Sequence, residues 1–533
     1  MSVLRFAWRS VLLALTLSVL GLNTAFADVV LHRGNGTEPD TLDPHRAASV
    51  WEDNIIADMF LGLTEKDTKG EVVPGAAESW TISEDGLVYT FKLRDNLVWS
   101  DGVPVKASDV VFGFRRILDP MTAARYASLL YQVKNAYAIN TGEMDPTEAG
   151  VRAIDAQTLE VTLESPAPFL PELLTHYTTF PIPQHVVEKY GDAWVRPGNM
   201  VSNGAYVLQE WVSNGHVKIT KNPLFYDADN VAIDTVFFYP IEDSRTAVKM
   251  FKSGELDMNI TTGAFPAAQL EDLLKELPGE ARVYPYLSSS YLPLNMTRPP
   301  FDDVRVRKAV SMLIDRDIIN QRVVAVGNIS AYSLVPPQTA NYQAGAQLDF
   351  AGVSMTDRTE QAKRLLAEAG YDDSNPLQFD LIYRNSYDNG RRISAIAAML
   401  RRVGVIADVA AMEARVAYVR MEQRDYQMGD GGWVADYNDP YNFLYLLMCD
   451  AGPLNWAGYC NPAYDALINQ AAKTLDMVER ARIMSEAEQL MLNDHPIIPM
   501  DFSTHRNLVS KRIQGFEDNI TNTHRTRYLS FKD

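Results

Sequence analysis

The fold class of this chain is decided by the stretch VFFYPIEDSRTAVKMFKSGELDMNI, residues 236–260. Its first six residues form a largely apolar run typical of a buried strand, and a helix is expected at about Thr246–Ser253. The run LDMNI then predicts a second strand. Strand, helix and strand in this order indicate parallel α/β units, so we expect an α/β protein.

Segments on either side of this stretch extend the α/β pattern. Alternating apolar and polar residues predict strands, and apolar residues at helical spacing predict helices. The expected strands are VYTFKLRDNLVW (88–99), TLEVTL (158–163) and LQFDLIY (377–383), with a hairpin after Val201; the expected helices are TEQAKRLLAEAG (359–370), RRISAIAAMLRRVG (391–404) and ERARIMSEAEQLML (479–492). A further helix is predicted to start with Ser108 and Asp109 as its cap. No low-complexity linker occurs, so extended strands are expected to join the lobes.

Length and composition limit the class of protein. A chain of 533 residues is several times the size of one typical domain, which predicts two or three lobes. Hydrophobic residues make up 47% and charged residues 22%, as in soluble globular proteins, which excludes general disorder. The formal net charge of −19 argues against nucleic acid as a partner, because phosphate recognition needs a basic surface.

The first 27 residues have the pattern of a cleaved signal peptide. Arg5 and Arg9 precede the apolar run at Val11–Leu22, and Ala25-Phe26-Ala27 forms a small-x-small cleavage sequence. The alternative is a retained anchor, although the apolar run is too short to span a bilayer comfortably. We therefore expect an exported, soluble, periplasmic protein.

Cys449 and Cys460 are the two cysteines of the chain, and they flank the turn-forming stretch Asp450–Pro453. An exported protein meets an oxidising compartment, so a disulfide between them is predicted. Two free, buried thiols are the alternative.

The sequence contains no catalytic signature. Its eight histidines are scattered without an HExxH pair, and there is no G-x-S-x-G elbow, P-loop or dinucleotide-binding fingerprint. Asp436-Tyr437-Asn438-Asp439 lacks the glycine and the glutamate of a calcium loop. The expectation is no metal, no cofactor and no enzymatic activity, with a carboxylate-based hydrolase as a weak alternative.

One segment carries a positive signal for ligand binding, GDGGWVADYNDP at residues 429–440. Its glycines allow close backbone approach, Trp433 offers a flat wall, and Asp436 supplies a charge that can meet an ammonium group. The alternative is a structural turn in which Trp433 lies in the core and Asp436 caps a helix.

Six blocks along the chain together resemble one protein family. They are GTEPDTLDPH (36–45), VPGAAESW (73–80), WSDGVPVKASDVVFGFRR (99–116), NPLFYDAD (222–229), PPFDDVRVRKAVSMLIDR (299–316) and GWVADYNDP (432–440). With these blocks the chain resembles the extracytoplasmic oligopeptide-binding proteins of ABC transporters, in the peptide/nickel solute-binding family.

The resemblance implies a periplasmic-binding-protein type II-like fold with two hinged lobes and an additional inserted domain. Carried onto this sequence, residues 1–27 are the signal peptide. Domain I is 28–60, 186–287 and 504–533, the inserted domain II is 61–185, and domain III is 288–503. The family implies a monomer that holds an extended oligopeptide between its lobes and delivers it to the permease subunits of an inner-membrane ABC transporter.

The resemblance also implies roles for single residues. Asp436 matches the aspartate that pairs with the peptide ammonium, and Gly432, Trp433 and Val434 match the strand and aromatic wall beside it. Val50 lies in the opposite backbone-pairing segment. Tyr126 and Tyr291 match aromatic residues that contact the ligand, with ordinary interface packing as the alternative for both.

Some family positions are occupied differently in this chain. Enterobacterial members place cations for the peptide carboxylate at positions that here hold Val324, Met421, Asp430, and Asn389 or Gly390. Nearby arginines could replace these cations from a shifted register; they are Arg322, Arg391, Arg392, Arg420 and Arg424. The family's disulfide positions hold Ser288 and Val434.

These departures change the expected ligand. A short free peptide would leave its carboxylate without a charge partner and beside the like charge of Asp430. We therefore expect either longer peptides, whose carboxyl end leaves the cleft, or ligands with an extra cationic group such as a muropeptide. Other candidate ligands are an opine, a sugar-phosphate conjugate and a metal chelate. A chaperone-like role is a further alternative for the function.

Overall fold

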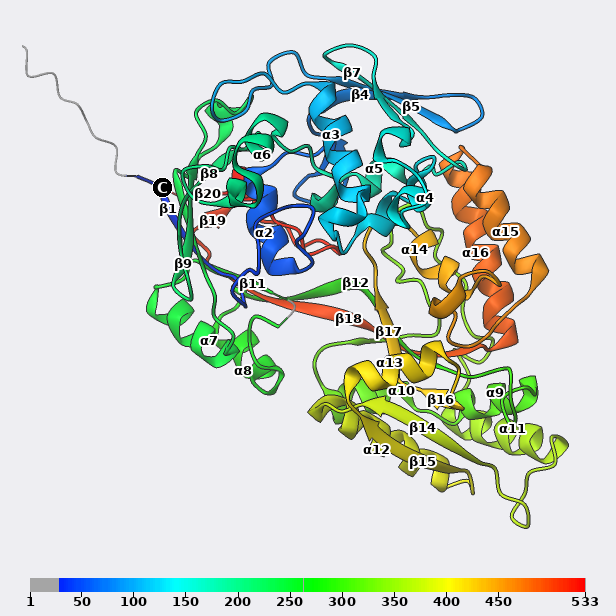
Figure 1. Cartoon of the computed structure of the whole chain (residues 1–533). Coiled ribbons are helices and arrows are strands. Elements are labelled where there is room, and N and C mark those ends of the chain that lie inside the picture. The colour runs from blue at the N-terminus through cyan, green and yellow to red at the C-terminus, as the bar shows by residue number, and fades with distance from the viewer. Residues whose placement is uncertain (1–27, 262, 533) are drawn as a thin grey trace, which may run out of the picture.

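The computed structural model describes residues 28–261 and 263–532, and the predicted signal peptide lies outside them. The chain is a mixed α/β protein built around a nine-stranded sheet in the order β17-β12-β18-β11-β1-β10-β9-β8, with β13 paired to β18. Smaller sheets of three and four strands lie in other parts of the molecule (Figure 1). The predicted α/β class is confirmed.

The stretch at 236–260 forms the expected parallel unit. β10 (Thr235–Tyr239) leads through α7 (Ser244–Ser253) to β11 (Met258–Thr261). Both strands pair in parallel with β1 (Val30–Gly34), which lies between them. Asp243 caps α7 by accepting the backbone N–H groups of Arg245 and Thr246, and Gly254 ends it at a φ of 80°. Beyond β10, β9 (His216–Lys221) and β8 (Tyr206–Val212) form the predicted hairpin.

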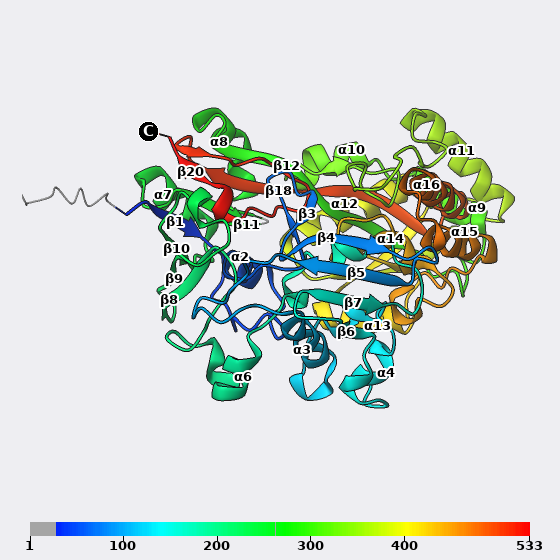
Figure 2. The same ribbon diagram turned by 90° about the horizontal axis from the view of Figure 1, so that it is seen from above.

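The segment after α2 (Val50–Met59) carries a four-stranded antiparallel sheet in the order β4-β5-β7-β6, and α3 packs against it (Figure 2). Its elements are β2 (Thr64–Lys66), β3 (Val72–Pro74), β4 (Ala77–Ile82), β5 (Val88–Leu93), α3 (Ala107–Leu118), α4 (Ala136–Asn140), β6 (Val151–Ala153), β7 (Thr158–Thr162), α5 (Leu170–Leu173) and α6 (Gln184–Tyr190). The predicted cap of α3 is wrong, because the helix begins at Ala107 and contains both Ser108 and Asp109. Asp109 instead accepts the N–H of Lys106 from inside the first turn.

The other lobe is mainly helical around the three-stranded sheet β15-β14-β16. Its elements are α9 (Val304–Met312), α10 (Arg316–Ile318), β13 (Ile329–Ser330), α11 (Met355–Glu368), β14 (Gln378–Arg384), α12 (Tyr387–Arg401), β15 (Ile406–Met412), α13 (Ala414–Glu422), β16 (Met428–Gly429), β17 (Gly431–Val434), α14 (Tyr441–Leu444), α15 (Pro462–Lys473) and α16 (Met477–Asp494). The predicted helices at 359–370, 391–404 and 479–492 are present as α11, α12 and α16, but α11 already ends at Glu368 and α12 at Arg401. In the part of the chain described, no helix is long and apolar enough to cross a membrane.

Two long antiparallel strands connect the lobes, β12 (Ala281–Pro293) and β18 (Ile497–Val509) (Figure 1). At one end, Ala281 and Leu508 pack in a small apolar cluster with α7 and α8 (Leu270–Glu276). At the other end, Leu292 and Ile498 belong to the core of the helical lobe. The predicted extended connection is therefore confirmed. Its pairing is interrupted by a β-bulge between Pro285 and Ser289.

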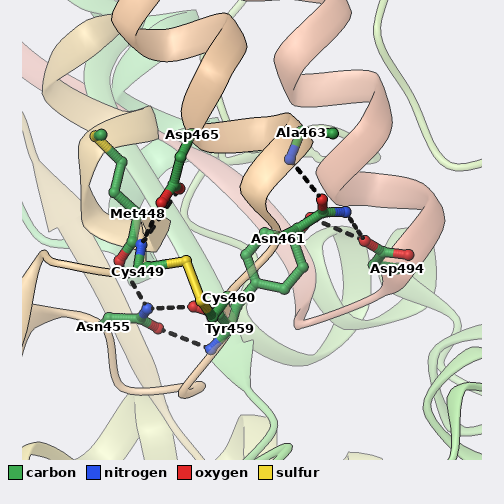
Figure 3. Close-up of a disulfide and its surroundings, with 9 residues drawn as sticks. All are labelled: Met448, Cys449, Asn455, Tyr459, Cys460, Asn461, Ala463, Asp465 and Asp494. Carbon is green, nitrogen blue, oxygen red and sulfur yellow. Dashed lines mark hydrogen bonds between the residues drawn. A yellow bond between two sulfur atoms is a disulfide. The ribbon is translucent and has the colours of Figure 1, made fainter.

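The final residues form the short pair β19 (Ile513–Gln514) and β20 (Ser530–Phe531). Cys449 and Cys460 form the predicted disulfide, with Cα atoms 4.5 Å apart (Figure 3). Inside the closed loop, Asn455 donates to the carbonyls of Met448 and Tyr459 and accepts the N–H of Tyr459. The bridge and this amide therefore fix the loop between α14 and α15.

Candidate functional site

A cavity of about 330 Å³ lies where the segments joined by the long strands meet. Its walls come from the start of α2, the end of β2, Tyr126, residues 175–177, the bulge of β12, the end of β17 with the residues that follow it, and the chain near the C-terminus. Such a cavity between lobes is a common position for a ligand site.

Asp436 lies on the wall of this cavity, at the end of a defined strand path. Ser288 of β12 pairs with Val434 of β17, and the N–H of Ala435 donates to the carbonyl of Leu287 at 3.0 Å. These bonds fix the backbone up to the residue before Asp436. The half-buried side chain is thereby directed by a paired strand and not by a mobile loop.

Within the part of the chain that the structure describes, the Asp436 carboxylate has no counter-charge. Among residues 28–261 and 263–532, no group donates a hydrogen bond to it and no cation pairs with it, and burial raises its pKa to about 6. It does not cap a helix either, because α14 begins only at Tyr441. The structural alternative for Asp436 is therefore wrong, and the carboxylate is available to a cationic group.

Aromatic rings surround this carboxylate. The cavity is lined by Tyr126, Tyr177 and Tyr286, and the ring of Tyr126 lies 5.2 Å from that of His176. Burial and then the charge of Asp436 raise the pKa of Tyr126, which indicates that the two side chains are close. Rings around a carboxylate exclude water and strengthen its attraction for a cation.

The structure brings together four of the predicted site residues. Asp436, Tyr126, Val434 and Val50 line the cavity, and the two valines are 51% and 46% exposed. Val50 is the first residue of α2. Gly432 lies against β12, where a Cβ atom would come within 3.0 Å of the carbonyl oxygen of Ser289.

Trp433 and Tyr291 lie away from the cavity wall. The indole N–H of Trp433 donates to Asn442 at 2.7 Å, and its ring packs edge-on against Tyr445. Tyr291 is 5% exposed and lies 6.1 Å from the ring of Trp456 in the core of the helical lobe. Both positions match the packing alternatives, and a ligand contact for either residue stays a prediction.

The expectation that Asp430 adds an unpaired negative charge to the site is wrong. It is 1% exposed and pairs with Arg392 at 2.7 Å and with Arg384 at 3.7 Å. Arg392 also lies 3.5 Å from Asp501. The like charge predicted beside a peptide carboxylate is therefore already offset. The main partner of Asp430 is Arg392, one of the arginines considered above as a replacement for the family's carboxylate-binding cations.

Several charged residues of the cavity had no signal in the sequence. Lys66 and Arg525 line it, paired with Glu172 at 3.1 Å and with Asp53 at 3.4 Å. The partners are separated by more than 100 and by more than 400 positions along the chain, so no local motif could have identified them. Among the described residues, no group of His, Cys, Asp and Glu side chains is arranged to hold a metal ion.

Comparison with known proteins identifies the family. Residues 71–454 match the bacterial extracellular solute-binding proteins, family 5. The periplasmic oligopeptide-binding protein OppA of Escherichia coli is 38% identical over 94% of this chain and 92% of its own. The probable deoxycholate-binding periplasmic protein YgiS of the same organism is 37% identical over 93% and 92%. The chain therefore belongs to family 5 of the bacterial extracellular solute-binding proteins, as the sequence blocks predicted.

Solved structures agree with this assignment. The unliganded open form of the murein tripeptide-binding protein MppA matches with a TM-score of 0.86 at 33% identity, over 95% of this chain and 97% of that one. OppA of Haemophilus influenzae in complex with the peptide RPPGFSPFR matches with a TM-score of 0.75 at 34% identity, over 95% and 99%. The chain thus superposes better on the open, unliganded relative than on the peptide complex.

Proposed function

We propose that this protein captures oligopeptides between its lobes in the periplasm and delivers them to an inner-membrane ABC transporter. The observation that carries the proposal is the Asp436 carboxylate, unpaired and surrounded by aromatic rings in the cavity between the lobes. The names of the relatives OppA and MppA support a peptide ligand. No chemical step is part of this function.

The recognition we propose has two parts. Asp436 binds the peptide ammonium, whose desolvation needs a charged partner. β17 is an edge strand of the large sheet and ends two residues before Asp436, so an extended peptide can pair with its free edge. Backbone pairing and a terminal ammonium are common to all peptides, so this mode tolerates different side chains.

Closure of the lobes completes the site in this proposal. Domain III (288–503) carries Asp436, and domain I (28–60, 186–287 and 504–533), together with the inserted domain II (61–185), carries the opposite wall. A ligand that contacts both walls binds the closed state more tightly and shifts the population toward it. The protein acts as a monomer, and its signal peptide directs it to the periplasm.

The test compares peptides that do and do not carry the ammonium. Asp436→Asn is expected to weaken binding of free-amine penta-alanine by at least about tenfold, or ~1.4 kcal/mol, because it removes a buried charge partner. Binding of N-acetylated penta-alanine, measured by the same calorimetry, is expected to be weak and equal in both proteins. Unchanged affinity of the variant for the free-amine peptide would remove the proposal.

A second candidate ligand is a murein peptide, favoured by the match to the unliganded MppA structure. Such a ligand still presents an amine to Asp436, so competition between a diaminopimelate-containing tripeptide and trialanine distinguishes the two. Deoxycholate, the ligand named for YgiS, is a carboxylic acid without an ammonium group. The charge of Asp436 opposes its carboxylate, so we expect deoxycholate to compete poorly.

A further inference from the structure

The cavity that contains Asp436 also contains positive charge from the protein itself. Of the described residues that line it, Lys66 and Arg525 are the cationic ones. Each is paired with a carboxylate, at 3.1 Å to Glu172 and at 3.4 Å to Asp53. Asp436 has no such partner among the residues that the structure describes, although a lysine ammonium is chemically similar to the amine end of a peptide.

Glu172 holds Lys66 from behind the cavity wall. It belongs to α5, its side chain is 5% exposed, and it does not line the cavity itself. The same carboxylate oxygen, Oε1, is close to Nζ of Lys66 and accepts the N–H of Asn438 at 2.9 Å. One buried oxygen thus contacts both the cavity lysine and the backbone two residues beyond Asp436.

The consequence follows from the chemistry of lysine. Its ammonium ends a flexible four-carbon chain, and the side chain of Lys66 is 9% exposed, so its charge requires a partner. If Glu172 were neutral, Lys66 would lose its partner, and Asp436 would be the unpaired carboxylate in the same cavity. Lys66 would then turn toward it and take the place of the ligand ammonium.

We infer that Glu172 is a positioning residue that keeps Lys66 away from Asp436, so that Asp436 stays vacant for the ligand. This inference rests on the proposed function. Glu172 does not touch the peptide in this mechanism; it acts by removing an internal competitor. The apparent affinity for the ligand is then the intrinsic affinity multiplied by the fraction of molecules in which Asp436 is free.

The experiment measures binding of free-amine and N-acetylated penta-alanine by calorimetry to the wild type and to each variant. Glu172→Gln removes the charge but keeps an oxygen for the N–H of Asn438, and it is expected to weaken binding of the free-amine peptide by about tenfold or more. The double variant Glu172→Gln with Lys66→Met removes the competitor and is expected to return affinity to within about threefold of the wild type. The N-acetylated peptide is expected to respond to neither change.

Glu65→Gln is the matched control. Glu65 precedes Lys66 in β2, is 4% exposed and pairs with Arg527, and it does not line the cavity. The same loss of a buried carboxylate there is expected to leave the affinity for penta-alanine unchanged. Thermal unfolding of each variant verifies folding. If Glu172→Gln does not fold, Glu172→Asp, which retracts the carboxylate, is expected to give a smaller loss with the same rescue by Lys66→Met.

The outcomes separate this inference from the function on which it rests. An unchanged affinity in Glu172→Gln, or a loss that Lys66→Met does not restore, would overturn the positioning role. The second result would mean that Glu172 acts only through the loop at Asn438. If Asp436→Asn also binds free-amine penta-alanine like the wild type, the proposed function is overturned with it.

Discussion

Asp430 and Asp436 lie six residues apart on one strand path, and their environments are opposite. Asp430 is 1% exposed and pairs with Arg392 and Arg384. Asp436 is half-buried beside an open cavity, burial raises its pKa, and no cation among the described residues pairs with it. A buried carboxylate with partners stabilises the native structure, whereas an unpaired one costs stability and suits an exchangeable guest.

The comparison predicts that breaking the paired site has the largest effect. Arg392→Met leaves Asp430 and Asp501 buried without their shared cation, and we expect a loss of about 3 kcal/mol in unfolding free energy, measured by urea denaturation. Arg384→Met is the control, because Arg384 is more exposed and lies farther from Asp430, and its loss should be about 1 kcal/mol or less. Equal losses in the two variants would contradict the assignment of Arg392 as the main partner.

The unpaired site should respond in the opposite direction. The pKa of Asp436 in the folded, unliganded protein is about 6, above the ordinary value of 3.8, so the folded state binds its proton more tightly than the unfolded state does. Stability is therefore lost as pH rises from about 4 through 6. Asp436→Asn should be more stable than the wild type at pH 7 by up to about 3 kcal/mol, with no difference near pH 4. A less stable variant at pH 7 would contradict the unpaired state.

Ligand affinity should follow the ionisation of the same carboxylate. A peptide ammonium binds the ionised form, so binding should weaken as pH falls through about 6. Between pH 7 and pH 5 we expect about a tenfold loss of affinity for free-amine penta-alanine, measured by calorimetry. Asp436→Asn should show no such dependence, and an equally steep profile in that variant would assign the titration to another group.

The smallest effect is expected at the other end of the ligand. The charges of Arg384, Arg392, Asp430 and Asp501 sum to zero, so this cluster offers a peptide carboxylate no net attraction. For matched peptides from three to eight residues, free and C-terminally amidated forms should bind within about threefold of each other. A strong preference for free tripeptides would show that Arg384 or Arg392 leaves Asp430 to bind the ligand.

Much of the fold was predictable because its signals are local. The parallel unit at 236–260, the hairpin after Val201 and the helices within α11, α12 and α16 depend on periodicity that adjacent residues display. The cap of α3 was misplaced because Ser108 and Asp109 are both good cap residues. Asp109 satisfies the start of the helix from its third position, and composition alone does not distinguish these two arrangements.

The candidate site was predictable only in part. Asp436 was identified from its segment and from the family blocks. The sequence did not show that its carboxylate lacks a partner. The pairing of Asp430 with Arg392 joins the strand path beside β16 to α12, and the pairing of Lys66 with Glu172 joins β2 to α5. Such contacts depend on tertiary packing, which a single sequence does not display.

The bulge of β12 has a mechanical consequence. Between Pro285 and Ser289 the ladder of β12 with β18 is interrupted, and Tyr286 and Leu287, which lie there, form part of the cavity wall. The backbone of Leu287 bonds instead to Ile520 and Ala435. In the proposed mechanism, a guest therefore touches the connection between the lobes where the pairing of its two strands is interrupted. A bound molecule would then act directly on this connection, without a relay through the rest of the protein.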